Sequence, residues 1–101
     1  MYDRMKIQQT FEEILWSKNV YFQPPESIKM SYPCIVYNIA SGDTKYADNK
    51  QYSFKFRYNV TLIDKNPDSL FVNKIMSLPS CKFDRHFAKD GLNHFVFNIY
   101  F

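Results

Sequence analysis

The sequence contains few of the residues from which catalytic and cofactor-binding sites are usually built. It has only two glycines, Gly42 and Gly91, so it cannot form a glycine-rich loop of the kind that holds phosphate groups. No serine lies in a GxSxG turn, and the two cysteines, Cys34 and Cys81, form no CxxC pair and have no metal-ligand spacing. We therefore expect no catalytic residues, no cofactor and no enzymatic activity.

Two histidines, His86 and His94, are the remaining candidates for a metal or acid–base site. With nearby aspartates they would converge if the strands around them pair as a hairpin. Histidines on the polar positions of a hairpin more often face solvent or bond to a carboxylate, so we predict no metal site. A disulfide between Cys34 and Cys81 is an open alternative if their strands are neighbours, although nothing else indicates an oxidising compartment.

The chain also lacks long apolar runs and a strong charge of one sign. No run approaches the length of a membrane span, and the N-terminus has no hydrophobic signal region. The net charge of +3 is mild and evenly spread, which argues against a nucleic-acid-binding stripe. A length of 101 residues predicts one domain, 1–101. Without a signal region or a membrane-length apolar run, we expect the protein in a cytoplasm or in a particle assembled there.

Aromatic residues, by contrast, are abundant, with ten Phe, eight Tyr and one Trp. A core of this size cannot enclose so many large rings, so several Tyr and Phe side chains are expected at contacts with partners. The alternative is that half-buried Tyr side chains cover the surface of a sheet.

The clearest local pattern is an alternating strand over residues 51–63. Tyr, Phe, Val or Leu occupies every second position from 52 to 62, and nearly all the positions between them are polar or charged. Successive side chains on a strand point to opposite faces, so one face is apolar and the other is polar and faces solvent. At about 3.3 Å per residue the strand spans roughly 40 Å, about twice a typical strand. The excess apolar face predicts self-association.

Helix signals lie on both sides of this strand. Apolar residues at helical spacing predict a helix over 4–17, with Asp3 as its N-cap. Asn66 as an N-cap, followed by Pro67 at the first helical position, predicts a second helix that Pro79 ends.

Further strands are predicted at 20–23, 34–40, 81–87 and 93–101. A polar turn region is expected over 41–50, and Asp-Gly at 90–91 signals a second hairpin. Within 81–87, simple alternation places Cys81, Phe83, Arg85 and Phe87 on one face. The predicted fold is α+β, with a largely antiparallel sheet of four to five strands, two helices packed on one face and a long projecting hairpin.

A nucleic-acid-binding module is an alternative function. Residues 54–58 interleave aromatic and basic side chains, as a base-stacking surface does. Strict alternation, however, places the rings and the charges on opposite faces of the strand. We therefore expect no specific nucleic-acid binding.

Seven segments of the chain, in order and with similar spacing, resemble a family of small proteins of tailed bacteriophages and prophages. The segments are VYFQPP (20–25), YPCIVY (32–37), YADNK (46–50), RYNVTLID (57–64), NPDS (66–69), FDRHF (83–87) and DGLNH (90–94). These proteins are described as minor capsid, tail-completion or head-to-tail joining proteins. The chain departs from the family at Asp90-Gly91, where Asp-Asn is more frequent, and either pair suits a turn.

The resemblance implies a tail terminator or tail-to-head joining protein, with another neck or connector component as the alternative. Such proteins form a hexameric ring that caps the tail tube and docks it to the head connector, and they can stay monomeric until a tail is present. The implied partners are further copies of the chain, the tail tube protein and the connector or stopper protein, in a virion assembled in the bacterial cytoplasm.

The hairpin that ends near residues 43–54 is the expected contact between copies. A ring needs a heterologous interface, in which two different patches meet. We predict that the interface includes Tyr46, Lys50, Tyr52 and Phe54.

Overall fold

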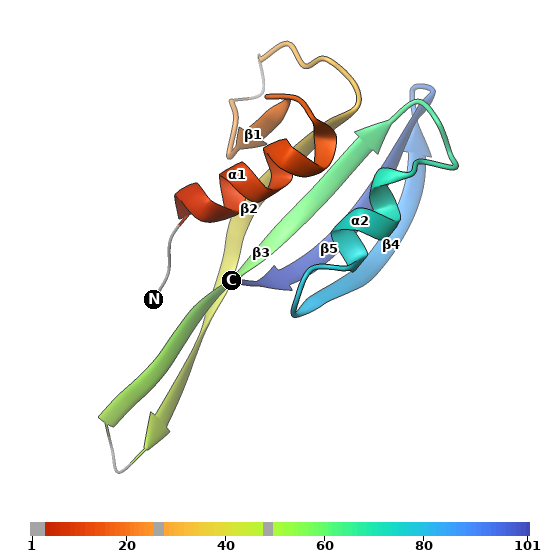
Figure 1. Ribbon diagram of the computed structural model, residues 1–101. Coiled ribbons are helices and arrows are strands. Elements are labelled where there is room, and N and C mark those ends of the chain that lie inside the picture. Colours follow the sequence, from red (N-terminus) through yellow and green to blue (C-terminus); the bar gives the residue numbers. More distant parts are fainter. Residues whose placement is uncertain (1–3, 26–27, 48–49) are drawn as a thin grey trace.

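A five-stranded sheet carries two helices on one of its faces (Figure 1). The computed structural model describes residues 4–25, 28–47 and 50–101, with their side chains except those of 43–55. The strand order is β1-β2-β3-β5-β4, in which β1 is parallel to β2 and the other neighbours are antiparallel. The predicted α+β class is confirmed. The elements are α1 (Arg4–Leu15), β1 (Val20–Phe22), β2 (Cys34–Ala47), β3 (Lys50–Asp64), α2 (Phe71–Met76), β4 (Cys81–Lys89) and β5 (Leu92–Tyr100).

Helix α1 packs on the sheet because its apolar residues recur at each turn. Ile7, Phe11 and Leu15 are buried, and their spacing of four places them on one side of the helix. The predicted N-cap, Asp3, lies outside the described residues. The helix ends at Leu15, two residues earlier than predicted, because Trp16 takes a left-handed conformation with φ 54°.

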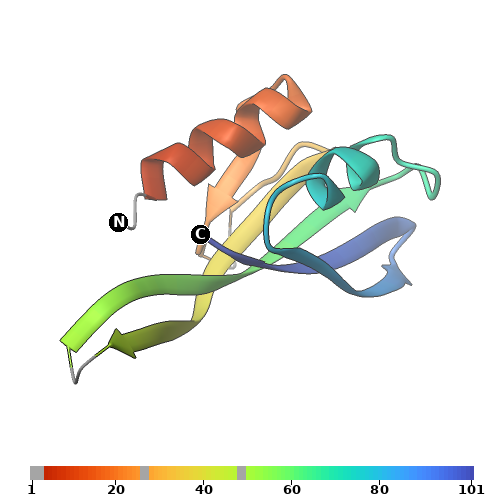
Figure 2. The same cartoon turned by 60° about the horizontal axis from the view of Figure 1, so that its bottom comes forward.

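The core lies between the two helices and the face of the sheet beneath them (Figure 2). The predicted apolar side of β3 supplies Tyr58, Val60 and Leu62, which are all fully buried. Tyr37 on β2 is the centre of an aromatic group, with Phe11 at 5.3 Å and Tyr58 at 5.9 Å between ring centroids. Part of the aromatic surplus is therefore inside the molecule.

Strands β2 and β3 continue together as a hairpin well beyond the other strands. β2 passes through the expected turn region at 41–50 and ends at Ala47, and β3 begins at Lys50, so that prediction is wrong for residues 41–47 and for Lys50. A shift of register after Ile39 leaves Ala40 as an extra residue, and pairing continues to Ala47 and Lys50. β5 pairs with β3 only as far as Arg57. The principal extents of 51, 25 and 22 Å reflect this projection (Figure 1).

A bulge in β4 changes which side chains share a face. Phe83 pairs with Phe97 and Arg85 pairs with Val96, so Asp84 is an extra residue in the ladder. Cys81 and Phe83 therefore lie on the helix side with β5 core residues, whereas Arg85 and Phe87 lie on the opposite face. The predicted common face for these four residues is wrong, because one inserted residue reverses the alternation.

The second helix is shorter than predicted. The Asn66 Oδ1 accepts a hydrogen bond from the Asp68 N–H at 2.9 Å, which makes an Asx-type turn in place of an N-cap. α2 itself begins at Phe71, after Leu70, which has no side-chain cap. No helix in the described part of the chain is long and apolar enough to cross a membrane.

Candidate interaction surfaces

The projecting hairpin holds the four residues predicted for an interface. In the backbone register, Tyr46 pairs with Gln51, Lys50 with Ala47, and Phe54 with Thr44. Tyr52 is an extra residue at a second register shift. The side chains of Tyr46, Lys50, Tyr52 and Phe54 lie outside the described residues, so their contacts stay a prediction.

Both outer edges of this hairpin lack a neighbouring strand among the described residues. β1 pairs only with residues 35–37 of β2, and β5 stops at Arg57 of β3. Unpaired N–H and C=O groups on such edges can accept a further strand. The hairpin therefore has the backbone groups needed to join another chain.

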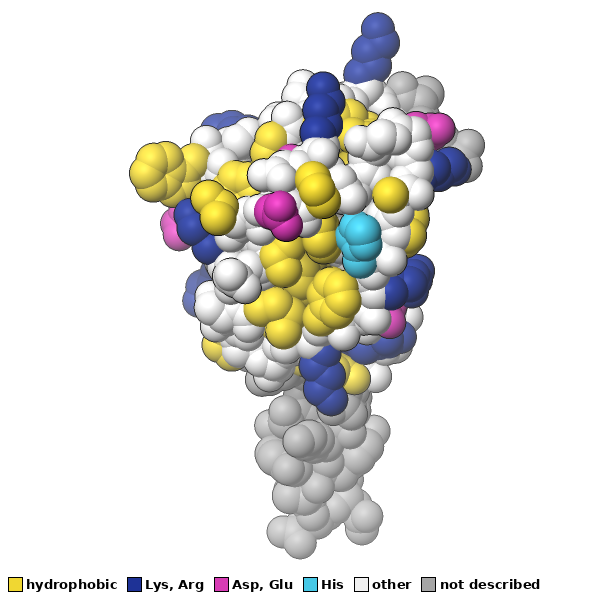
Figure 3. All heavy atoms as spheres, turned by 90° about the vertical axis from the view of Figure 1, so that its right-hand side faces the viewer, with side chains coloured by type: hydrophobic (Ala, Val, Ile, Leu, Met, Phe, Trp, Pro, Cys, Tyr) yellow, Lys and Arg dark blue, Asp and Glu magenta, His cyan; other side chains and the backbone are white. Residues whose placement is uncertain are grey.

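The opposite side of the sheet ends at β4, which is a second open edge. All of its residues from Lys82 to Lys89 are exposed. Phe83 is 46% exposed and Phe87 is 40% exposed, and apolar side chains gather on this side of the molecule (Figure 3). Several charged residues on the strand suit an edge that avoids indiscriminate pairing.

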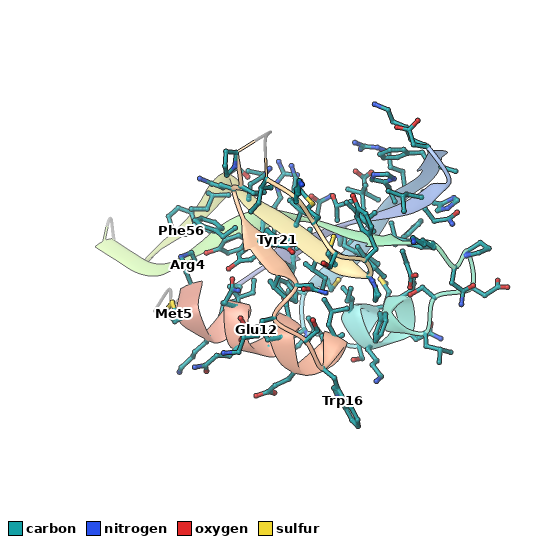
Figure 4. The ribbon with its side chains drawn as sticks, turned by 90° about the horizontal axis from the view of Figure 1, so that it is seen from above. Arg4, Met5, Glu12, Trp16, Tyr21 and Phe56 are labelled. Atoms are coloured by element: carbon teal, nitrogen blue, oxygen red, sulfur yellow. The ribbon has the colours of Figure 1, made fainter. Side chains whose placement is uncertain are left out.

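The face of the sheet away from the helices forms a hollow. The β1–β2 loop and the β4–β5 hairpin rise on this side of the sheet (Figure 4). The hollow has a volume of about 340 Å³. Its lining combines apolar and polar side chains. The lining includes Met30, Val36, Ile63, Phe87 and Val96, with Asn38, Asn59, Thr61, Asp84, Arg85 and His94.

A row of asparagines crosses the floor of this face. Asn38, Asn59 and Asn98 are directly opposite one another on β2, β3 and β5. Arg57 extends the polar region, because its Nε donates to the Ser41 Oγ at 2.9 Å and its Nη1 to the Asn98 Oδ1 at 3.4 Å. This amide-lined floor can donate and accept hydrogen bonds along an extended partner.

The rings and the charge of the central strand lie on opposite faces, as expected. Phe56 and Tyr58 pack on the helix side, with ring centroids 6.3 Å apart. Arg57 lies on the hollow side, bonded to Ser41 and Asn98. Aromatic stacking and positive charge therefore do not combine on the described part of this strand to form a base-binding platform.

The histidines do not come together. His86 stacks near Phe95 on the helix side with ring centroids 4.7 Å apart, whereas His94 stacks on Phe87 on the hollow side at 4.6 Å. The bulge at Asp84 separates them, so the expectation that both occupy polar positions on one face is wrong. Within the described ranges, no three His, Cys, Asp or Glu residues form a group able to hold a metal.

Both cysteines are free thiols. Cys34 is buried, and burial raises the pKa of its thiol from its ordinary value of 9.0 to about 12. Burial also raises the pKa of the half-buried Cys81. Both thiols are therefore protonated at neutral pH, which disfavours nucleophilic chemistry.

Trp16 is the most exposed large apolar side chain in the described part of the chain, at 89%. It follows the last turn of α1 and points away from the sheet (Figure 4). The Lys74 Nζ lies 6.0 Å from the indole centroid. The sequence pattern did not single out this residue, because a Trp at the end of a helix carries no termination signal.

The chain matches no known family model and no curated protein. The resemblance to phage proteins therefore rests on the residue pattern alone.

Proposed function

We propose that this chain is a structural protein of a phage tail, a tail terminator or tail-to-head joining protein that acts as a ring. In this role, copies of the chain cap the tail tube and provide the docking surface for the head connector. The proposal places the protein in the virion neck, with the tail tube protein and the connector or stopper protein as partners.

The observation that carries the proposal is the β2–β3 hairpin, which extends past the sheet and, among its described residues, pairs with no other strand beyond the ends of β1 and β5. The molecule is 51 Å long and only 25 and 22 Å across, so the end of the hairpin can contact another molecule far from the core of its own domain. The β4 edge, on the other side of the sheet, is a different open edge. Two unlike surfaces of this kind suit the heterologous contact that closes a ring.

The register provides a precise way to shorten the hairpin. Lys45 pairs with Ser53, so replacing residues 46–52 with Asn-Gly joins a paired position by a two-residue turn. The core residues are unchanged in this variant. It should therefore fold with the stability of the wild-type monomer, and it should fail to terminate tails.

The test uses a phage or inducible prophage that encodes the chain. We expect deletion of the gene to give overlong tail tubes without heads, and the wild-type gene to restore normal length. The shortened hairpin should not restore it. A control, Asp90→Asn, gives the β4–β5 hairpin the same Asn-Gly turn without shortening it and should behave as wild type. Normal tails with the shortened hairpin would contradict the proposal, and normal-length tails without heads in the deletion strain would indicate joining rather than termination.

A further inference from the structure

Trp16 occupies a position that a helix normally gives to glycine. The Ser17 N–H donates to the Glu12 carbonyl at 3.2 Å and the Trp16 N–H to the Glu13 carbonyl at 3.4 Å. These two bonds define a Schellman motif with Trp16 at the left-handed position, usually Gly and sometimes Asn. A bulky L-residue there is strained by about 1–2 kcal/mol.

The indole contributes little to the monomer in return for this strain. Trp16 is 89% exposed, and Lys74 lies at the outer limit of a cation–π contact. Trp is the residue type most enriched at the energetic centres of protein interfaces. A strained, exposed Trp that does not stabilise its own chain indicates a contact with another one.

We propose that Trp16 of one copy inserts into the hollow on the open face of the sheet of a second copy. The hollow is large enough, since a cavity of about 150 Å³ can hold benzene and this one has a volume of about 340 Å³. Met30, Val36 and Val96 offer apolar and sulfur contacts to an aromatic ring.

The hollow also satisfies the one polar group of the indole. A buried Trp N–H needs an acceptor, and the side-chain carbonyls of Asn38 and Asn59 line the hollow. The His94 Nδ1 lies 3.3 Å from the Leu92 carbonyl, which can only accept. In the neutral ring, Nδ1 therefore carries the proton and Nε2 is a further acceptor.

Charge does not oppose this pairing. The surface around Trp16 is lined by two carboxylates, Glu12 and Glu13, and by Lys18. The hollow adjoins a shallower depression that also contacts Met30, Val36, Asn38 and Asn59. Together the two are lined by two guanidinium groups, Arg57 and Arg85, and by one carboxylate, Asp84. Even with Lys74 counted, the Trp16 side is neutral and the hollow is net positive. Glu13 is exposed, and the Arg85 side chain is 63% exposed. One Nη of Arg85 already contacts Asp84 at 2.8 Å, and its other N–H groups can donate to Glu13 of another copy.

The two surfaces lie on opposite sides of the sheet, because α1 covers one face and the hollow is on the other (Figure 4). Each copy therefore supplies one Trp16 and one hollow, which gives a heterologous contact that can be repeated from copy to copy. This inference rests on the proposed role in assembly and adds a second contact between copies, beside the one assigned to the β2–β3 hairpin.

Trp16 is the only tryptophan of the chain, so its fluorescence reports the contact directly. As protein concentration rises, we expect the emission to shift to shorter wavelength and acrylamide quenching to fall. Thr61→Phe places a ring on the floor of the hollow, where the indole would insert, and should keep the emission of exposed Trp at all concentrations. Thr61→Ser, at the same position, should associate as wild type. Leu70→Ala removes another highly exposed apolar side chain, 78% exposed, and should also associate normally.

The decisive experiment mixes two variants that each lack one half of the contact. Trp16→Ala keeps the hollow and should weaken self-association at least about 30-fold by sedimentation. Thr61→Phe keeps Trp16. Each alone should be monomeric, whereas an equimolar mixture should form a one-to-one heterodimer and nothing larger. Circular dichroism establishes that both variants fold.

Two results would overturn the inference. One is a wild-type emission that does not change up to the highest soluble concentration. The other is a mixture that stays monomeric while the wild type associates. Neither result bears on the length of tails in the deletion strain, so the proposed function is tested separately from this contact.

Discussion

The conformation of Trp16 leads to a prediction about stability in which glycine is favoured over alanine. At a left-handed position an L-residue is strained by about 1–2 kcal/mol, and glycine avoids this strain. Glycine also raises the entropy of the unfolded chain, and this lowers the stability advantage of glycine by roughly 0.4–1 kcal/mol. Both Trp16→Gly and Trp16→Ala remove the indole and its weak contact with Lys74, so their difference isolates the backbone term. We expect Trp16→Gly to be more stable than Trp16→Ala by about 0.5–1 kcal/mol.

Urea unfolding of dilute, monomeric protein measures this difference. With a slope of about 1–3 kcal/mol per molar, the midpoint should be higher for the glycine variant by roughly 0.2–1 M. The slopes of the two variants should agree, because the same surface is exposed on unfolding. An alanine variant as stable as the glycine variant would show that residue 16 is not left-handed, and the argument that Trp16 is kept for an external contact would lose its basis.

Three further predictions concern the body of the domain. Phe97→Ala should lower the free energy of unfolding by about 3–5 kcal/mol, because the ring is fully buried, whereas the half-exposed Phe83→Ala should cost much less in the same urea titration. Gly91→Ala should cost about 1 kcal/mol from backbone strain alone, since φ is +74° and an added Cβ meets nothing within 4 Å; equal stability would show a different turn. Cys34 should react with a thiol reagent at pH 8 far more slowly than Cys81 and only as fast as unfolding allows. The thiol of Cys34 keeps its proton up to about pH 12 in the folded protein and loses it near pH 9 in the unfolded chain. The free energy of unfolding should therefore fall as the pH rises from 9 to 12, and Cys34→Ala should lack this part of the fall.

Patterns of local sequence predicted the elements whose period is uninterrupted. The helical spacing of Ile7, Phe11 and Leu15 and the alternation of Tyr58 and Val60 gave the correct buried sides, because burial imposes those periods directly. They also indicated the α+β class with a mostly antiparallel sheet.

The candidate surfaces were harder to predict, because they depend on irregularities that carry no local signal. The extra residue Asp84 reverses the faces of Arg85 and Phe87 and thereby places them beside the hollow. The hollow itself combines residues of four strands and a loop, so it is defined only once the register is known. Trp16 was missed because the usual sign of a left-handed helix end is a glycine or an asparagine.

The length of tails assembled with the shortened hairpin tests the central claim most directly. Electron microscopy of particles from the deletion strain, complemented with the variant in which Asn-Gly replaces residues 46–52, should show overlong tubes without heads. Complementation with the wild-type chain should give tails of one length joined to heads. Tails of normal length on the shortened hairpin would contradict the claim that the projecting β2–β3 hairpin is needed for copies of this molecule to assemble at the end of the tail.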